Sequence, residues 1–315
     1  MKIIRVALIG FGNVGQGFAE ILRDYKHIYT DTFNLDIRIV AISDLQYGAV
    51  YHPEGLDPAE LLSAIHKNNS LDDFDSAEET GWDAQTTIEN CNAHIIAEIS
   101  FTDLQTGEPA TSHFRQALEN GKHVITTNKG PIALHFDELN KLAQENDVKI
   151  GYEGTVMSGT PALHLGVDVL RSAGLRKIEG ILNGTTNYIL TEMAKGLSYE
   201  AVLKEAQRLG YAEADPRGDV EGHDAAAKVA ILSSVLMGAS LKPDQVDCAG
   251  ITGFNQSQIV EARDANQCWK LIGNVERSNG KVKASVKPIR LPLTHPFAAV
   301  NGATNAIHYT TDLLG

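Results

Sequence analysis

The chain has 315 residues, of which 43% are hydrophobic and 21% are charged. That composition is ordinary for a globular protein, and the length suits two domains. The formal net charge of -13 argues against nucleic acid or an anionic membrane surface as a partner, and no apolar run is long enough for a membrane span. The three cysteines are too far apart for a metal or redox motif, which suits a reducing, cytoplasmic location.

The chain opens with a buried strand that leads into a glycine-rich turn. Residues 3–9 form a continuous apolar run, and GFGNVG follows at once, before a helical pattern. This is a GxGxxG motif in the setting that dinucleotide binding requires: the first glycine allows a tight turn, the second leaves room for a pyrophosphate, and the third lets the helix approach the strand. A purely structural glycine turn is the alternative. The motif residues are Gly10, Phe11, Gly12, Asn13, Val14 and Gly15.

Strands and helices alternate through the first half of the chain. Apolar runs predict strands at 37–42, 95–100 and 124–127, and helical patterns predict helices at 57–67 and 109–120. This alternation predicts a doubly wound parallel sheet of the Rossmann type, with ligands bound at the carboxyl edge of its strands.

Several candidate ligand-binding residues fall at that edge. Asp44 ends the second strand, where it can accept hydrogen bonds from an adenosine ribose and so favour NAD. An ordinary loop aspartate is the alternative, and the choice between NAD and NADP stays open. The third strand ends in Ser100, followed by Phe101. Lys129 lies in a loop predicted at 128–131, where it can reach a nicotinamide or a substrate carboxylate; a solvated lysine is the alternative.

A loop rich in small residues is predicted at 153–161, after a helix at 136–145 and a strand at 148–152. One carboxylate, that of Glu153, stands among closely spaced backbone carbonyls, and such a set can hold a hard cation through oxygen. An ordinary loop is the alternative.

The segment from Gly210 to Leu236 begins with carboxylates and turn residues and continues as an apolar helix that starts near Asp224. Asp224 and Lys228 are four residues apart and so share one face of that helix. A helix that is apolar on every side is buried, and a buried lysine is costly unless paired. The pattern predicts a functional charged pair at the start of an interior helix, with a surface ion pair as the alternative.

The rest of the second half has weaker patterns. The elements expected there are a strand at 177–181, a helix at 188–195, a helix at 199–209 and a strand-rich segment at 262–289. Thr186 or Asn187 is expected to cap the first of these helices. The dipeptide Asn279-Gly280 predicts a hairpin turn.

Five stretches together resemble one family, the homoserine dehydrogenases. They are GFGNVG, Asn128-Lys129, NGTTNYILTEM, GYAEADPRGDVEGHDAAAK and HPFAAVNGATNAI, and the likeness extends over nearly the whole chain. The resemblance implies NAD(P)-dependent interconversion of L-homoserine and L-aspartate 4-semialdehyde, a step toward threonine, methionine and isoleucine. It also implies a homodimer and a short form of the enzyme without a regulatory ACT domain.

The resemblance further implies how the chain is divided. A dinucleotide-binding domain is expected at 1–133 together with the C-terminal 302–315. A second, α+β domain for substrate binding and dimerisation is expected at 134–301. The nicotinamide would meet the substrate between the two domains.

The same resemblance implies a role for individual residues. Lys228 becomes the acid–base residue, and Asp224 orients it. The substrate amino group falls near Glu213 and Asp224, and Lys129 falls close to both cofactor and substrate, where it can also transfer protons. The cofactor loops carry Gly12, Asn13, Val14, Ser100 and Phe101. The positions of sodium ligands, mainly backbone carbonyls, are those of Glu153, Val156, Ser158 and Thr160.

Two departures from the family pattern bear on activity. Gly218 stands where an aspartate is common, which would loosen hydrogen bonding on the substrate side. Relatives usually continue past the position of Gly315 with a second glycine-rich turn that closes on the cofactor, so we expect cofactor affinity or turnover to differ. Two other interpretations stay open: another two-domain amino-acid dehydrogenase, and an inactive NAD(P)-binding sensor or scaffold.

Overall fold

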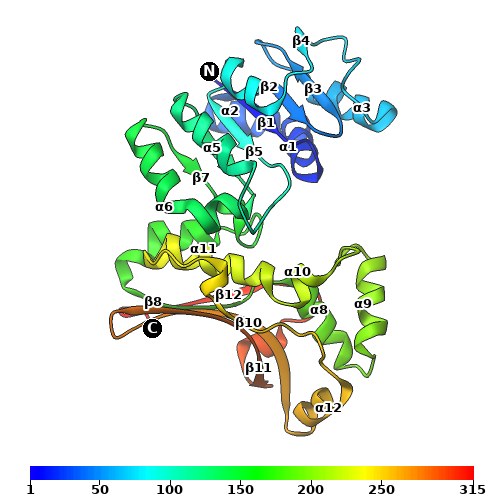
Figure 1. Ribbon diagram of the computed structural model, residues 1–315, viewed down its shortest axis with the longest axis vertical. Helices are drawn as coiled ribbons and strands as arrows, with labels where there is room; N and C mark the ends of the chain where they lie inside the picture. The colour runs from blue at the N-terminus through cyan, green and yellow to red at the C-terminus, as the bar shows by residue number, and fades with distance from the viewer. The chain divides into compact units, whose positions relative to one another are not determined.

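The computed structural model describes residues 1–315, and the chain divides into two compact units, Met1–Gly154 and Thr155–Gly315 (Figure 1). We call them unit 1 and unit 2. The boundary expected after residue 133 is therefore wrong. A long helix and a short strand beyond that residue remain part of unit 1, because the helix packs on its neighbour in this unit and the strand pairs with the preceding strand.

Unit 1 is built on one large sheet. Its strands are β1 (Lys2–Ile9), β2 (Leu35–Asp44), β3 (Gly48–Tyr51), β4 (Glu79–Thr80), β5 (Ile95–Glu98), β6 (His123–Thr126) and β7 (Ile150–Gly151). The order across the sheet is β4-β3-β2-β1-β5-β6-β7. From β2 to β7 all neighbours are parallel, and β3 and β4 add an antiparallel edge. The predicted Rossmann-type parallel sheet is confirmed.

Helices lie between successive strands of this sheet. They are α1 (Asn13–Asp24), α2 (Lys26–Phe33), α3 (Pro58–Asn68), α4 (Ala84–Asn90), α5 (Ala110–Glu119) and α6 (Lys129–Glu145). α1 buries Gly15, Ala19 and Leu22, which recur every three or four residues and so form one apolar stripe. Leu8 of β1 is fully buried in the same core, where a side chain of this size stabilises the fold by about 1.5–3 kcal/mol.

Lys129 begins a helix, so the loop predicted at 128–131 is wrong. Asn128 is the N-cap of α6, and its side-chain oxygen accepts a hydrogen bond from the backbone N–H of Gly130 at 3.1 Å. An asparagine in the short turn between a strand and a helix can cap that helix. The backbone of His135 is non-helical and divides α6, which explains why the helical pattern in the sequence is clear only beyond it.

Unit 2 contains a second, mixed sheet. Its strands are β8 (Leu175–Ile181), β9 (Asp247–Cys248), β10 (Gln267–Ser278), β11 (Lys281–Pro292) and β12 (Ala306–Thr311). The order is β12-β8-β10-β11-β9, and only the β11–β9 pair is parallel. β10 and β11 meet at the hairpin predicted from Asn279-Gly280, where both residues have positive φ.

The helices of unit 2 vary widely in length. The α-helices are α7 (Ala162–His164), α8 (Gly184–Met193), α9 (Tyr199–Arg208), α10 (Arg217–Val220), α11 (His223–Met237) and α12 (Gln256–Asp264). Short 3-10 or π turns are η1 (Glu153–Thr155), which begins at the end of unit 1, η2 (Leu165–Leu170), η3 (Arg171–Ala173), η4 (Pro243–Gln245) and η5 (Pro296–Ala299). The combination of these helices with the sheet confirms the predicted α+β architecture.

The C-terminal segment belongs to unit 2, so the assignment of 302–315 to the dinucleotide-binding domain is wrong. β12 pairs antiparallel with β8, and Ile307 lies opposite Gly180 (Figure 1). Pairing satisfies the backbone hydrogen-bonding groups of both strands and fixes this segment at the edge of the unit 2 sheet.

α11 packs against β10 and β11 and is the interior helix that the sequence predicts. Every residue from Val229 to Met237 is buried. Gly273 of β10 allows the close approach, because a Cβ there would lie 2.8 Å from a methyl carbon of Val229. The start of α11 is therefore held against the sheet with little freedom to move.

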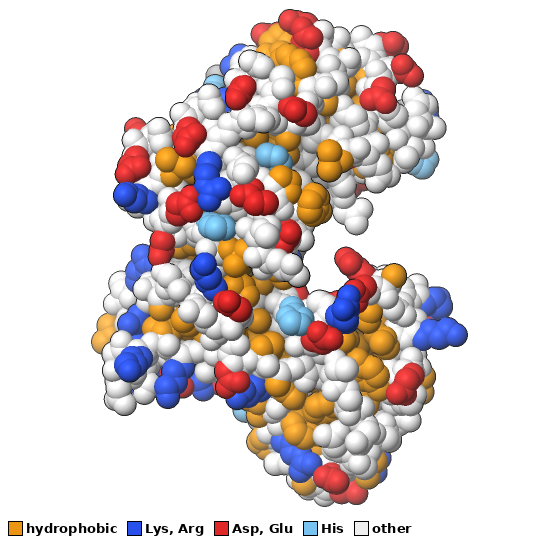
Figure 2. Space-filling model, in the orientation of Figure 1, with side chains coloured by type: hydrophobic (Ala, Val, Ile, Leu, Met, Phe, Trp, Pro, Cys, Tyr) orange, Lys and Arg blue, Asp and Glu red, His pale blue; other side chains and the backbone are white.

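The helices include none that is both long and apolar enough to span a membrane. On the face drawn in Figure 2, acidic and basic side chains lie interspersed.

Candidate active site

The glycine-rich turn opens on a cavity at the carboxyl edge of the unit 1 sheet, which we call the edge cavity. Its volume is about 850 Å³, within the usual range of small-molecule sites. The ends of β1, β2 and β5 form part of its wall, and the segment that leads into α4 forms another part. Of the predicted cofactor residues, Gly10, Gly12, Asp44, Ser100 and Phe101 line it together.

The three glycines of the motif differ in what a side chain would meet. Gly10 has a φ of +101°, and a Cβ there would lie 2.7 Å from the carbonyl oxygen of Ile99. A Cβ at Gly15 would lie 3.0 Å from the carbonyl oxygen of Gly10. At Gly12 it would meet nothing within 4 Å. The fold itself thus requires glycine at the first and third positions, whereas the second leaves open space at the start of α1.

That open space fits the pyrophosphate of a dinucleotide. Gly12 is the N-cap of α1, and the first backbone N–H groups of a helix attract phosphate together with the helix dipole. Phe11 is fully buried and can contribute only its backbone, whereas Asn13 and Val14 are exposed on the first turn of α1.

We expect Gly12→Val to weaken NAD(H) binding by roughly tenfold or more while the melting temperature stays close to that of the natural chain, because about 1.4 kcal/mol of lost contact is enough for tenfold. Gly17→Val is the control, since a Cβ at Gly17 also meets nothing within 4 Å and Gly17 does not line the edge cavity. Titration calorimetry and thermal melts measure both effects. Equal weakening in the two variants would contradict a phosphate site at Gly12.

Asp44 closes the glycine turn from the end of β2. Its Oδ2 accepts a hydrogen bond from the backbone N–H of Phe11 at 2.7 Å. Its Oδ1 accepts from the backbone N–H groups of Gln46 at 2.8 Å and Tyr47 at 3.0 Å. These three bonds fix the carboxylate at the wall of the edge cavity.

A buried carboxylate that sequence reasoning missed adjoins this wall. Glu98 has no exposed surface; its Oε1 accepts a hydrogen bond from Ser100 Oγ and lies 3.3 Å from His113 Nδ1. Its Oε2 accepts from Asn128 Nδ2 at 3.2 Å. One acid thereby joins the loop after β5 to the N-cap of α6. Half-buried Lys129 is the first residue of that helix, so its position depends on the same contacts.

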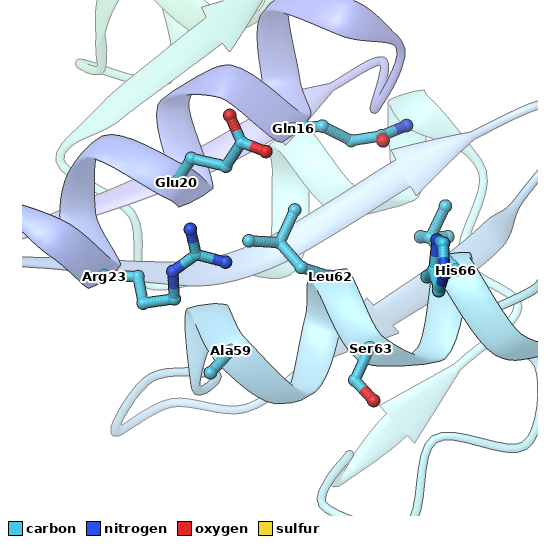
Figure 3. A pocket seen from close by; sticks show the side chains of 8 residues that line it. Gln16, Glu20, Arg23, Ala59, Leu62, Ser63 and His66 are labelled. Atoms are coloured by element: carbon cyan, nitrogen blue, oxygen red, sulfur yellow. The ribbon is translucent and has the colours of Figure 1, made fainter.

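A second hollow, of about 560 Å³, lies between α1 and α3 (Figure 3). Glu20 and Arg23 project into it from α1, and Leu62 and His66 from α3. None of the predicted site residues lines it. It has no part in the candidate site.

In unit 2, the charged pair predicted at the start of α11 is mostly shielded from solvent. Lys228 Nζ lies 2.7 Å from Asp224 Oδ2 and donates a hydrogen bond of 2.7 Å to the backbone carbonyl of Leu182. The side chains of Lys228 and Asp224 are only 13% and 18% exposed, which excludes the alternative of a surface ion pair. Two of the three ammonium hydrogens are used in these contacts.

Asn183 joins that pair to a second carboxylate. Its side-chain oxygen accepts a hydrogen bond from the backbone N–H of Thr186 at 2.9 Å, which makes Asn183 the N-cap of α8. The cap predicted at Thr186 or Asn187 is therefore wrong, and the helix begins earlier. The capping bond turns the amide nitrogen of Asn183 toward Asp219 Oδ1, at 2.6 Å, and Asp224 Oδ2, at 2.9 Å.

Asp219 is the second residue that sequence reasoning missed, although it stands in the carboxylate-rich approach to α11. Burial raises the pKa of the Asp219 carboxyl above its usual value, the hydrogen bond from Asn183 opposes that rise, and the nearby charge of Asp224 adds to it. Because this pKa is higher in the folded than in the unfolded chain, the contribution of Asp219 to stability falls as the pH rises from the unfolded toward the folded value. Ionised carboxylates kept at a cost to stability are typical of functional sites.

Glu213 takes no part in the hydrogen bonds of this cluster. It is exposed in the turn after α9, where its backbone carbonyl accepts a hydrogen bond from Gln207 Nε2 at 3.1 Å. Thr185 Oγ1 donates to the carbonyl of Tyr211 at 2.6 Å and ties the turn to the start of α8. Gly218 is exposed in α10, with open space around its Cα.

The loop predicted to hold a cation has an unusual backbone. Met157 and Ser158 have φ values of +60° and +54°, a conformation that costs a non-glycine residue about 1–3 kcal/mol. Glu153 begins η1, Val156 is buried, and Thr160 is exposed. No group of three or more His, Cys, Asp or Glu side chains could hold a metal ion, so a cation here would rely on backbone carbonyls.

Comparison with known proteins finds relatives of the whole chain. A family model described as the NAD-binding domain of homoserine dehydrogenase matches residues 10–153, and one described as homoserine dehydrogenase matches residues 161–315. The NAD(+)-dependent homoserine dehydrogenase of Pseudomonas canavaninivorans is 43% identical over 316 residues, which cover 100% of this chain and 90% of that protein. The homoserine dehydrogenase of Methanocaldococcus jannaschii is 36% identical, with 98% and 90% covered.

Solved structures give the same result. A putative homoserine dehydrogenase from Archaeoglobus fulgidus superimposes with a TM-score of 0.87 at 33% identity, covering 99% of this chain and 91% of that one. A hyperthermophilic archaeal homoserine dehydrogenase in complex with NADPH has a TM-score of 0.84 at 29% identity, with 99% and 89% covered. Together with the glycine-rich edge cavity and the buried lysine of α11, these matches show that the chain belongs to the homoserine dehydrogenase family of NAD(P)-dependent oxidoreductases acting on CH–OH groups.

Proposed function

We propose that Lys228 is the acid–base residue with which this chain interconverts L-aspartate 4-semialdehyde and L-homoserine. The observation that carries the proposal is the buried contact of Lys228 with Asp224 at 2.7 Å. The carboxylate pairs with the ammonium group and, together with the carbonyl of Leu182, fixes its direction. One ammonium hydrogen remains to be directed at a substrate oxygen, where the charge stabilises a developing alkoxide and the proton completes the reduction.

The substrate amino group is assigned to the acidic cluster beside that lysine. Asp219 and Asp224 are held together by the amide of Asn183, and the closeness of two carboxylates favours a bound ammonium group. Glu213, in the neighbouring turn, is a further candidate for the same group. A substrate ammonium would offset the repulsion between the two carboxylates that the free chain holds close together.

The cofactor is assigned to the edge cavity and its glycine-rich turn. When bound, NAD(P)H supplies the hydride for the aldehyde carbon. Gly10 to Gly15 would hold the pyrophosphate, Ser100 and Phe101 would line the approach to the nicotinamide, and Lys129 would touch both cofactor and substrate. Lys129 is half-buried at the start of α6, whose N-cap is Asn128, and this supports a side chain held in place rather than a fully solvated one.

Further properties are proposed from the family resemblance. They are a place in the biosynthesis of threonine, methionine and isoleucine, a cytoplasmic homodimer, and a sodium ion held by Glu153, Val156, Ser158 and Thr160. The net charge of -13 supports the absence of nucleic acid among the partners. The left-handed backbone at Met157 and Ser158 supports a loop shaped for a ligand rather than an ordinary connection.

The direct test is oxidation of NADH and of NADPH by the purified chain in the presence of L-aspartate 4-semialdehyde, with formation of L-homoserine measured as the product. We expect turnover with at least one cofactor and formation of one homoserine for each cofactor oxidised. Binding of either cofactor without reduction of the semialdehyde would instead support the sensor or scaffold interpretation.

A further inference from the structure

A lysine that the proposed mechanism does not use lies inside unit 2. Lys270 of β10 is only 2% exposed, and its three hydrogen-bond partners are all uncharged oxygens. Its Nζ donates to Asn187 Oδ1 at 2.9 Å, to the backbone carbonyl of Val300 and to Asn301 Oδ1 at 3.3 Å. An ammonium group has three hydrogens, so these contacts use all of them. Burying a charge with no opposite charge beside it is costly, so these contacts have to be strong to keep the ammonium group inside.

The contacts of Lys270 fasten a turn to a helix. Residues 300–304 form the turn before β12, which we call the 300–304 turn, and it supplies two of the three oxygens. The third comes from Asn187 of α8. The amide nitrogen of Asn187 binds the same turn, because it donates to the backbone carbonyls of Val300 at 3.1 Å and Thr304 at 3.0 Å. The ammonium group therefore completes a set of hydrogen bonds that joins the 300–304 turn to the first half of α8.

The 300–304 turn also lies directly against the start of α8. A Cβ at Gly184 would lie 2.6 Å from the backbone carbonyl oxygen of Ala303, so there is no room for a side chain between the turn and the helix. Gly184 follows Asn183, whose amide nitrogen joins the two acids of the active-site cluster. The residue before Asn183 is Leu182, which supplies the carbonyl to which the proposed acid–base lysine donates. Movement of the turn would thus be felt at both of these positions.

We propose that Lys270 is a positioning residue of the reaction. By fastening the 300–304 turn to α8, it fixes the residues at the start of that helix, Leu182 and Asn183. Those residues in turn hold Lys228 and its carboxylate partner. The inference rests on the proposed function, in which Lys228 transfers the proton. Misplacement of a reacting group by about 1 Å can cost roughly 10²-fold in rate, so a loosened start of α8 is measurable in turnover.

Lys270→Met is the first variant, since methionine keeps much of the length of the side chain but has no ammonium group. Lys122→Met is the matched control in unit 1, because Lys122 is 9% exposed and its Nζ donates to the backbone carbonyls of Ile88 and Cys91. Both variants should lower the melting temperature, since each leaves buried acceptors unpaired. Only Lys270→Met should lower kcat for semialdehyde reduction, by roughly 10–10²-fold, with the dissociation constant of NAD(H) unchanged. Equal kcat values in the two variants would overturn the proposal.

Amide hydrogen exchange provides a measurement that does not depend on turnover. We expect a peptide covering residues 183–187 of the full chain to exchange roughly tenfold faster in Lys270→Met than in the natural chain, and at the natural rate in Lys122→Met. Unchanged exchange in Lys270→Met would overturn the proposal even if kcat falls. Absence of semialdehyde reduction in the natural chain would count against the proposed function, whereas the exchange rates still decide whether Lys270 holds the start of α8.

Gly184→Ala tests the same contact without altering Lys270, and it decides the matter if Lys270→Met does not fold. Alanine favours a helix more than glycine does, but its Cβ would push the 300–304 turn away from α8. We expect kcat to fall by roughly tenfold, again with unchanged NAD(H) binding. Gly17→Ala is the control, since a Cβ at Gly17 meets nothing within 4 Å, and its kcat should equal that of the natural chain. A natural kcat in Gly184→Ala would contradict the coupling of the turn to the active-site cluster.

Discussion

Lys228→Ala should lower kcat for semialdehyde reduction by roughly 10²–10⁴, the range expected when a positioned acid–base group is removed. The loss should appear in kcat rather than in the dissociation constant of NAD(H), since the cofactor is assigned to unit 1 and Lys228 belongs to unit 2. Steady-state kinetics and calorimetry on the same preparation separate the two effects. Unchanged turnover would remove Lys228 from the mechanism.

Two further variants separate proton transfer from simple charge. Lys195→Ala removes a lysine whose Nζ also lies 2.7 Å from a carboxylate, that of Glu192, but whose side chain is 64% exposed. Its kcat for semialdehyde reduction should equal that of the natural chain. Lys228→Arg keeps a cation beside Asp224 but releases its proton far less readily, because arginine remains charged at any working pH. Restored activity in the arginine variant would show that charge alone is sufficient and that proton transfer comes from elsewhere.

The parallel sheet of unit 1 could be predicted because each signal was local. The apolar run of β1, the glycine turn and the amphipathic stripe of α1 follow one another within a short stretch, and each has its own physical reason. The antiparallel edge formed by β3 and β4 could not be predicted in the same way. Its strands are short, and their existence depends on the neighbour that β2 provides.

The pairing of the C-terminal strand β12 could not be predicted from local sequence either. Nothing within residues 302–315 indicates whether they join the first or the second sheet. The choice depends on the free edge of β8, which lies more than a hundred residues earlier in the chain. The expectation that this segment joins the dinucleotide-binding domain came from the resemblance alone and not from any pattern within the segment.

Half of the hydrogen-bonded cluster around Lys228 could be predicted from the sequence, for a related reason. Asp224 and Lys228 share a helix face, so their spacing in the sequence is enough to bring them together. Asn183 and Asp219 reach them from α8 and α10, and no spacing in the sequence measures that distance. Interpreting NGTTN as a cap motif, with its first asparagine rather than a threonine as the cap, would have identified Asn183.

Glu98→Ala should lower the free energy of unfolding by about 3 kcal/mol or more and should also weaken cofactor binding. Its carboxylate is fully buried, accepts hydrogen bonds from Ser100 and Asn128 and lies beside His113, so its removal leaves a buried cavity and takes one hydrogen-bond partner from these groups. Ser100 lines the edge cavity, and Asn128 caps the helix that begins with Lys129. Chemical denaturation and titration with NAD+ measure the two effects.

The effect should be large because water cannot replace the contacts of a buried acid, whereas it can replace those of an acid at the surface. Glu138→Ala is the control: this glutamate accepts hydrogen bonds from Arg115 Nε at 2.6 Å and from Arg115 Nη2 at 3.2 Å, but its side chain is 51% exposed. Water can replace those contacts, so its loss should cost no more than about 1 kcal/mol. Glu98→Gln keeps the shape of the side chain but turns an amide N–H toward groups that themselves donate. Its loss of unfolding free energy should therefore lie between those of Glu98→Ala and Glu138→Ala. If Glu98→Ala is no more destabilising than Glu138→Ala, the prediction is wrong. The loop after β5 and the start of α6 would then be held by backbone contacts and not by the Glu98 carboxylate.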